Sequence, residues 1–277
     1  MTANSPISRE LQILKILERQ SPKGLSANYI VQLLDAFIHK GPNGTHQCLV
    51  FELLGLSVDK VLSDYYEAHD ELDSETVLRI STQLLKAVKF IHSAGICHGD
   101  ISSRNIAFSC THLSKQTEEQ LFDILRFPEI EPLKRVDSTP LDEDDEDIQL
   151  LDFGEKMIFT DHFDYRVDLW RTGCMIYSFL FTTWPFWYLS EDEILIYQMI
   201  GFVERLPAKW ESMLRSSRHN LELEDDYGTS KLERKFAGLP DPTLKPLLHV
   251  IQGLMRFLPS SHLTAEEALD LLGNVQD

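Results

Sequence analysis

Polar and apolar side chains alternate along residues 74–95 with spacings of three and four, the period of one helix face. The positions on that face are Val77, Leu78, Ser81, Leu84, Leu85, Val88 and Ile91. This pattern predicts an amphipathic helix, which Ser74 caps and Gly95 ends. Two shorter apolar runs, at 31–37 and 48–51, predict β-strands, and Asn43-Gly44 between them predicts a hairpin turn.

Residues 172–190 carry no charged side chain, and a run of this length raises the question of a membrane span. Pro185 interrupts the run, and the hydroxyls of Ser178, Thr182 and Thr183 dilute it. We therefore expect a buried segment of a globular protein here and no membrane as a partner.

The composition fits a packed core in one large domain or two lobes, with 277 residues, 43% hydrophobic and 10% aromatic. The formal net charge of -18 disfavours nucleic acid, which rewards clustered lysine and arginine, and favours basic proteins or peptides as partners. The four cysteines follow no metal or disulfide spacing, and residues 1–10 contain no apolar signal segment. An intracellular location, in the cytoplasm or the nucleus, is expected.

Two short motifs carry the chemistry: HGDISSRN at 98–105 and LLDFG at 150–154. Phosphoryl transfer needs charge neutralisation and alignment more than covalent help from the protein. Asp100 has the chemistry to accept a hydroxyl proton, and Asn105 and Asp152 offer the oxygen ligands that magnesium prefers. His-x-Asp-x-x-x-x-Asn followed by Asp-Phe-Gly therefore predicts an enzyme that uses ATP and Mg²⁺.

With these motifs the chain resembles the protein kinases, and other segments match that family in order. Residues 8–17 resemble the helix that carries an ion-pair glutamate, here Glu10, and 48–55 resemble the hinge over which adenine lies. Residues 164–174 match the Asp-x-Trp-x-x-Gly start of a buried central helix. Residues 264–269 match the final helix, which a capping box between Thr264 and Glu267 opens.

The resemblance implies roles for further residues. Phe51 stands in the gatekeeper position of the ATP site, and Glu52 and Leu54 offer backbone groups to adenine. His98 is a structural member of the catalytic loop, and Asp168 braces that loop from the central helix.

Among the kinases, the chain most resembles fungal kinases similar to the serine/arginine-rich-protein-specific kinases, through residues 31–55, the catalytic loop and residues 118–137. This resemblance implies a protein substrate that is rich in arginine. An insertion at 111–148 ends in six acids at 142–147, which form either a solvated loop or a counter-charge for such substrates.

The sequence also departs from the family. It contains no Gly-x-Gly-x-x-Gly, residues 1–9 are too few for a strand with the ATP-anchoring lysine, and 156–163 are too few for a full activation segment. Ser102 stands where a phosphate-facing lysine is usual, and Arg104 is the predicted catalytic substitute.

We therefore expect an α+β, bilobal, protein-kinase-like fold with a truncated small lobe at 1–53 and a mainly helical large lobe at 54–277. The remnant small-lobe sheet should expose an edge that a partner covers. The predicted activity is that of a protein serine/threonine kinase. Two alternatives stay open: a pseudokinase or truncated gene product that acts as a binding module, and a small-molecule phosphotransferase, of which His-Gly-Asp with an asparagine five residues later is typical.

Overall fold

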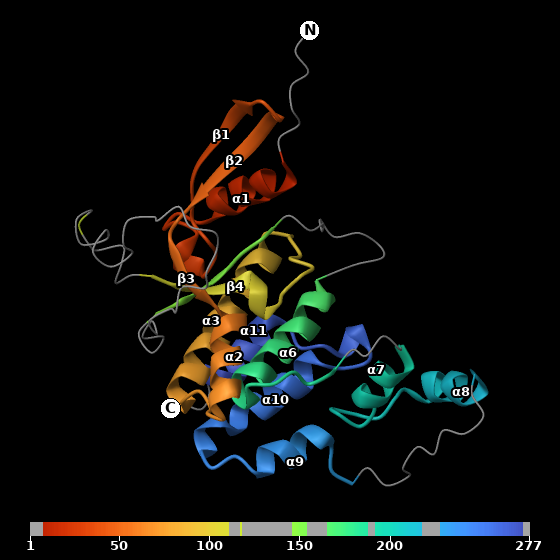
Figure 1. Cartoon of the computed structure of the whole chain (residues 1–277). Coiled ribbons are helices and arrows are strands. Elements are labelled where there is room, and N and C mark those ends of the chain that lie inside the picture. Colours follow the sequence, from red (N-terminus) through yellow and green to blue (C-terminus); the bar gives the residue numbers. More distant parts are fainter. Residues whose placement is uncertain are drawn as a thin grey trace.

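The computed structural model describes residues 8–110, 117, 146–153, 165–187, 192–217 and 228–273. Most of the insertion predicted at 111–148 lies outside the described residues, as do Gly154 and the stretch 156–163. The described part has a hairpin and one helix at one end, a small sheet in the middle and a larger group of helices at the other end (Figure 1).

The hairpin consists of β1 (Leu33–Gly41) and β2 (Gly44–Phe51), which pair in antiparallel orientation. Both predicted strands are confirmed, but they extend further toward the turn than the apolar runs do. The turn lies one residue earlier than predicted, at Pro42 and Asn43, because Gly44 is already the first residue of β2 and pairs with Gly41. The added residues at the tip are mostly exposed, so their side chains need no apolar pattern. Figure 1 shows α1 (Arg9–Gln20) alongside this hairpin. The N–H of Ser8, the N-cap of α1, donates to the side-chain oxygen of Gln47 in β2 at 2.7 Å.

The second sheet has three antiparallel strands in the order β3-β4-β5. They are β3 (Leu54–Ser57), β4 (Ile106–Ser109) and β5 (Ile148–Leu150). The chain before β1 also reaches this sheet, because Ile30 forms a parallel bridge with Leu150 and the Leu150 N–H donates to the Tyr29 carbonyl at 2.9 Å. The strand that leads into Asp152 is therefore fixed to the N-terminal part of the chain.

The helix predicted at 74–95 is confirmed as α3 (Ser74–Ser93), but its cap is Asp73 and not Ser74. The Asp73 carboxylate accepts the N–H groups of Glu75 and Thr76, at 2.9 and 3.0 Å. An aspartate one residue earlier reaches these two N–H groups, and Ser74 becomes the first helical residue. Gly95 follows the helix with a φ of 73°, a conformation that glycine adopts without strain.

The central helix is α6 (Arg166–Phe181), in which ten of 16 residues are buried. It packs against α3 and α10 (Lys245–Leu254), and α11 (Ala265–Gly273) packs against α3 and α10. The remaining elements are α2 (Val58–Ala68), α7 (Asp192–Met199), α8 (Ala208–Ser217), α9 (Lys231–Ala237) and the 3-10 turns η1 (Ser26–Asn28), η2 (Ser103–Asn105), η4 (Pro242–Leu244) and η5 (Pro259–Ser261). No helix in the described ranges is both long and apolar enough to cross a bilayer.

The architecture is α+β, as expected, with small antiparallel sheets and a mainly helical remainder. The predicted boundary between residues 53 and 54 falls between the end of β2 and the start of β3. The division into two lobes at that point stays a prediction. The predicted capping box is confirmed, because Thr264 and Glu267 exchange hydrogen bonds at the start of α11.

Candidate functional site

His98 opens the loop of the first motif and is almost fully buried. Its Nε2 lies 2.8 Å from the Leu151 carbonyl, and its Nδ1 lies 3.2 Å from the N–H of Asp100. A carbonyl requires a donor and an N–H requires an acceptor, so Nε2 carries the proton and Nδ1 does not. Burial lowers the pKa of His98 and outweighs the opposing effects of the Leu151 carbonyl and nearby carboxylates. A neutral ring therefore ties the two motifs together.

Asp168 is fully buried in the first turn of α6 and holds the loop by its backbone. Its carboxylate accepts the N–H groups of His98 and Gly99, both at 2.8 Å, and lies 3.0 Å from the His92 ring. Burial favours the neutral form of Asp168. The hydrogen bond and charge of His92, together with the two N–H donors, outweigh this effect, so the pKa of Asp168 lies below its ordinary value. Gly99 has a φ of 80°, which only glycine adopts readily.

The candidate base Asp100 is half-exposed, and its carbonyl and carboxylate accept three hydrogen bonds. The Asn105 side-chain nitrogen donates to the Asp100 carbonyl at 2.8 Å and to its carboxylate at 3.0 Å. Arg171, one turn after Asp168 on α6, donates to the other carboxylate oxygen. The structure thus joins the predicted base, the predicted metal ligand Asn105 and an arginine that the sequence did not single out.

Asp152 follows β5 and lies beside this group. The Leu151 N–H donates to the Asn105 carbonyl at 2.8 Å, which fixes the chain just before Asp152 to the catalytic loop. The next residue, Phe153, is buried with its ring edge-on to His98 at 4.9 Å between centroids. Asp152 itself has a φ of 59°, which is uncommon for a residue with a side chain.

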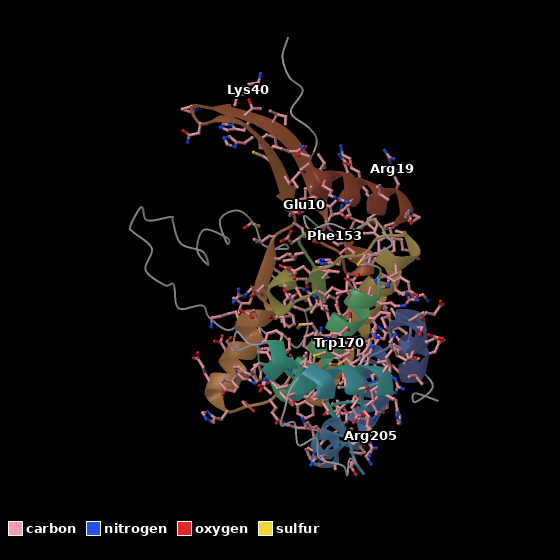
Figure 2. The ribbon with its side chains drawn as sticks, turned by 90° about the vertical axis from the view of Figure 1, so that its right-hand side faces the viewer. Glu10, Arg19, Lys40, Phe153, Trp170 and Arg205 are labelled. Atoms are coloured by element: carbon pink, nitrogen blue, oxygen red, sulfur yellow. The ribbon has the colours of Figure 1, made fainter. Side chains whose placement is uncertain are left out.

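Glu10 of α1 lies near enough to Asp152 for the two charges to interact. Burial raises the pKa of Glu10, and the charge of Asp152 raises it further, so the two carboxylates are electrostatic neighbours. Figure 2 shows Glu10 near Phe153, between the hairpin and the helical part. The predicted ion-pair glutamate and the predicted metal ligand therefore meet at this junction.

The donor set fits magnesium that also binds substrate phosphates. Asn105 directs its amide nitrogen to Asp100, so its amide oxygen is the group for a cation, and Asp152 supplies a carboxylate. Mg²⁺ usually takes one or two protein oxygens together with phosphate oxygens, and not a full protein cage. The described residues contain no cluster of three or more His, Cys, Asp or Glu side chains suited to a metal.

The predicted hinge residues lie between the two sheets. Phe51 ends β2 and is partly buried against the core. The Glu52 N–H donates to the Gln32 carbonyl at 3.0 Å, and its carboxylate accepts the Gln32 N–H at 2.7 Å. Leu54 begins β3 opposite Ser109 of β4. Adenine binding at these three positions stays a prediction.

The predicted catalytic residue Arg104 lies beside Asp59, and its catalytic role stays a prediction. Its Nε lies 3.6 Å from a carboxylate oxygen of Asp59 in α2, and its side chain is 83% exposed. Sequence reasoning missed Arg171, although a signal existed: residues three apart share one helix face, so a contact of Asp168 with the loop places Arg171 near it.

The last two residues of the acidic run at 142–147 are described and are anchored to the fold. Glu146 is buried and accepts the hydroxyl of Ser109, and the Asp147 N–H donates to the same hydroxyl at 3.0 Å. The Gln83 side chain donates to the Asp147 carboxylate. These two residues are therefore not part of a freely solvated loop. The other four acids lie outside the described residues.

Comparisons with known proteins agree with this geometry. Residues 3–271 match the model of the protein kinase domain. The chain is 37% identical over 98 residues to "Protein kinase dsk1" of Schizosaccharomyces pombe, covering 35% of this chain and 18% of that protein. It is 37% identical over 97 residues to "Serine/threonine-protein kinase SKY1" of Saccharomyces cerevisiae, covering 35% of this chain and 13% of that protein.

A longer match links the chain to human "Dual specificity protein kinase CLK1", at 25% identity over 293 aligned residues, covering 94% of this chain and 55% of that protein. The chain thus spans less than two thirds of the length of each of these relatives. The domain match, in contrast, extends over nearly all of its residues, including every site residue described above. The chain belongs to the protein kinase domain family.

Proposed function

We propose that the chain transfers the γ-phosphate of ATP to a serine or threonine hydroxyl of a protein. The observation that carries this proposal is the junction of the two motifs. Asn105 is hydrogen-bonded to Asp100 through its side chain and to Leu151 through its backbone, so the base and both metal ligands form one unit. The match of the chain to serine/threonine and dual-specificity kinases supports the same reaction.

Asp100 accepts the proton of the substrate hydroxyl as the hydroxyl oxygen bonds to the γ-phosphorus. The bond from that phosphorus to the bridging β-γ oxygen breaks, and ADP leaves with the bonding electrons. Asn105 and Asp152 hold Mg²⁺, which when bound neutralises charge on the phosphates. His98 and Asp168 keep the loop in place through the bonds described above.

We also propose that the protein substrate is rich in arginine. The net charge of -18 favours a basic partner. In addition, a cavity of about 170 Å³ between α2 and the end of α6 joins the Glu67 carboxylate to the rings of Tyr66, Trp184 and Trp187. Asp59 also lines this cavity, but its carboxylate already contacts Ser103 and Arg104. Carboxylates together with aromatic faces suit a guanidinium group. We also propose that the protein is intracellular.

The test is phosphate transfer from labelled ATP to an arginine-rich serine peptide, with the same peptide carrying glutamate in place of arginine as comparison. Asp100→Ala should reduce the rate by about 10² to 10⁴, the usual contribution of a positioned base. Asp270→Ala, which removes an exposed carboxylate of α11, serves as the matched control and should leave the rate unchanged.

Binding of ATP and Mg²⁺ without any transfer, in a protein that melts cooperatively, would refute the proposed activity and favour a pseudokinase. Transfer to both peptides at equal rates would refute only the arginine preference. Transfer to a small alcohol or aminoglycoside, but to neither peptide, would identify a small-molecule phosphotransferase.

A further inference from the structure

The proposed reaction needs a positive charge beside the γ-phosphate, because negative charge is spread over its oxygens in the transition state. Ser102 supplies no charge at its place in the catalytic loop. Arg104 has the charge, but it is directed toward Asp59 and is largely exposed. The loop itself therefore presents no cation to Asp100 in the described structure.

Arg171 of α6 presents a positive charge to Asp100. Its guanidinium donates to the Asp100 carboxylate, and 38% of its side chain is exposed, so the group is partly open to solvent beside the candidate base. The helix that carries it is packed into the core, since Asp168 and Thr172 on the same part of α6 are fully buried. The hydrogen bonds of Asp168 to the loop fix the position of α6 relative to the loop.

The chemistry of arginine suits two partners at once. A guanidinium has five N–H donors in a planar fork and stays charged at every accessible pH. One edge can hold a carboxylate oxygen while the remaining donors face a phosphate. The Asn105 amide contacts the other carboxylate oxygen of Asp100, so the base is oriented from two sides.

We propose that Arg171 is the residue of this chain that binds the γ-phosphate beside Asp100, in place of a cation from the catalytic loop. This inference rests on the proposed function. It assigns a phosphate-binding role to a residue of the central helix and leaves Arg104 as a partner of Asp59.

The opposite role for the same contact is a lock, in which Arg171 occupies Asp100 and keeps it from a hydroxyl. The two roles predict opposite changes in the rate of phosphate transfer when Arg171 is removed. Removal of a lock speeds transfer and leaves ATP affinity unchanged, whereas removal of a γ-phosphate ligand slows transfer and weakens ATP but not ADP.

The test compares the affinities of ATP and ADP, each with Mg²⁺, for the full chain, measured by calorimetry. Arg171→Met should weaken ATP binding about tenfold, or about 1.4 kcal/mol, and leave ADP within about twofold. Arg171→Lys keeps the charge and should keep most of the ATP preference. Arg104→Met removes the same group from the catalytic loop and tests the competing prediction that Arg104 is the phosphate ligand; the proposal requires that it change neither affinity. Arg171→Gln replaces the methionine variant if that variant does not melt cooperatively.

Unchanged ATP preference in a folded Arg171 variant would overturn the proposal, and so would loss of that preference in Arg104→Met alone. Faster transfer with unchanged ATP affinity in Arg171→Met would establish the lock instead. If the wild-type chain binds neither nucleotide, the proposed function fails and this inference fails with it. That outcome is distinct, because it appears before any substitution is made.

Discussion

The Glu10 carboxyl, at the junction of α1 and the small sheet, lies in surroundings that disfavour its charged form. Burial raises the pKa of Glu10, and the neighbouring charge of Asp152 adds to this effect. A raised pKa means that the folded protein disfavours the charged carboxylate. Two acids brought together in this way form a place where a cation is favourable, which agrees with the predicted nucleotide and magnesium site.

The pH dependence of stability should reveal this cost. The folded pKa of Glu10 lies above its ordinary value, so its stabilising contribution is complete below the unfolded pKa and is lost as pH rises through the folded pKa. Glu10→Gln should therefore raise the melting temperature at pH 7 and have almost no effect near pH 3.5. Thermal melts of both proteins at the two pH values measure this difference. Glu18→Gln, an exposed position on the same helix, is the control, and an equal rise there would show that the effect is not local to Glu10.

At the residue scale, sequence spacing predicted the site in part. The loop that contains Asp100 and Asn105 is continuous in sequence, so one motif specifies both residues and their contact. Arg171 lies 71 residues after Asp100, and only the packing of α6 against the loop brings them together. No local pattern encodes that contact on its own; it follows only once Asp168 is assigned to the loop, because residues three apart share one helix face. For the same reason, the sequence suggested Arg104 as the cation, whereas the structure directs Arg104 to Asp59.

At the element scale, the packing of α6 depends on a residue without a side chain. A Cβ at Gly173 would lie 2.5 Å from Cγ of Met255 and 3.3 Å from Cβ of Leu254, which ends α10. Helices that approach this closely leave no room for a methyl group, because protein interiors are already close-packed. Gly173 therefore sets the distance between α6 and the end of α10, and with it the position of Asp168 and Arg171.

Gly173→Ala should destabilise the protein by about 1–3 kcal/mol, the usual cost of an added methyl group in a packed core. The better helix propensity of alanine offsets at most about 1 kcal/mol of this cost. Urea unfolding measures the difference in the free energy of unfolding. Gly273→Ala at the end of α11, where a Cβ meets no atom within 4 Å, should change stability far less. Equal effects of the two substitutions would mean that the contact with Met255 adjusts without cost.

The sequence predicted which helices and strands form more accurately than the residues at which they begin and end. Periodicity identified α3 correctly, because this helix buries one face and the pattern records which residues are buried. The hairpin was identified from its apolar runs and turn residues, although no residue of β1 or β2 is fully buried. The sequence did not identify Asp73 as the cap of α3, since aspartate and serine are both good caps and adjacent in sequence. It also stopped both strands short of the turn, where exposed residues carry no apolar signal.

At the scale of the whole molecule, the hairpin is the least protected part of the described structure. β1 exposes Leu34 at 63%, Phe37 at 47% and Ile38 at 49%, and the sheet contains two strands. Figure 1 shows this hairpin projecting from the rest of the chain. A two-stranded hairpin is marginal in water, and an exposed apolar edge is a site of association. The expectation that a partner covers this sheet edge follows from these exposures and stays a prediction.

Ile38→Lys tests whether the hairpin causes association. The wild-type chain should form larger species as its concentration rises, and lysine on the exposed strand should shift this distribution toward the monomer, since a charge at an open strand edge opposes pairing. Sedimentation over a series of concentrations gives the result. Leu258→Lys is the matched control, because Leu258 is 45% exposed but lies between α10 and α11. If both substitutions act alike, the change in net charge and not the hairpin governs association. A wild-type chain that stays monomeric throughout would show that the hairpin edge is protected without a partner.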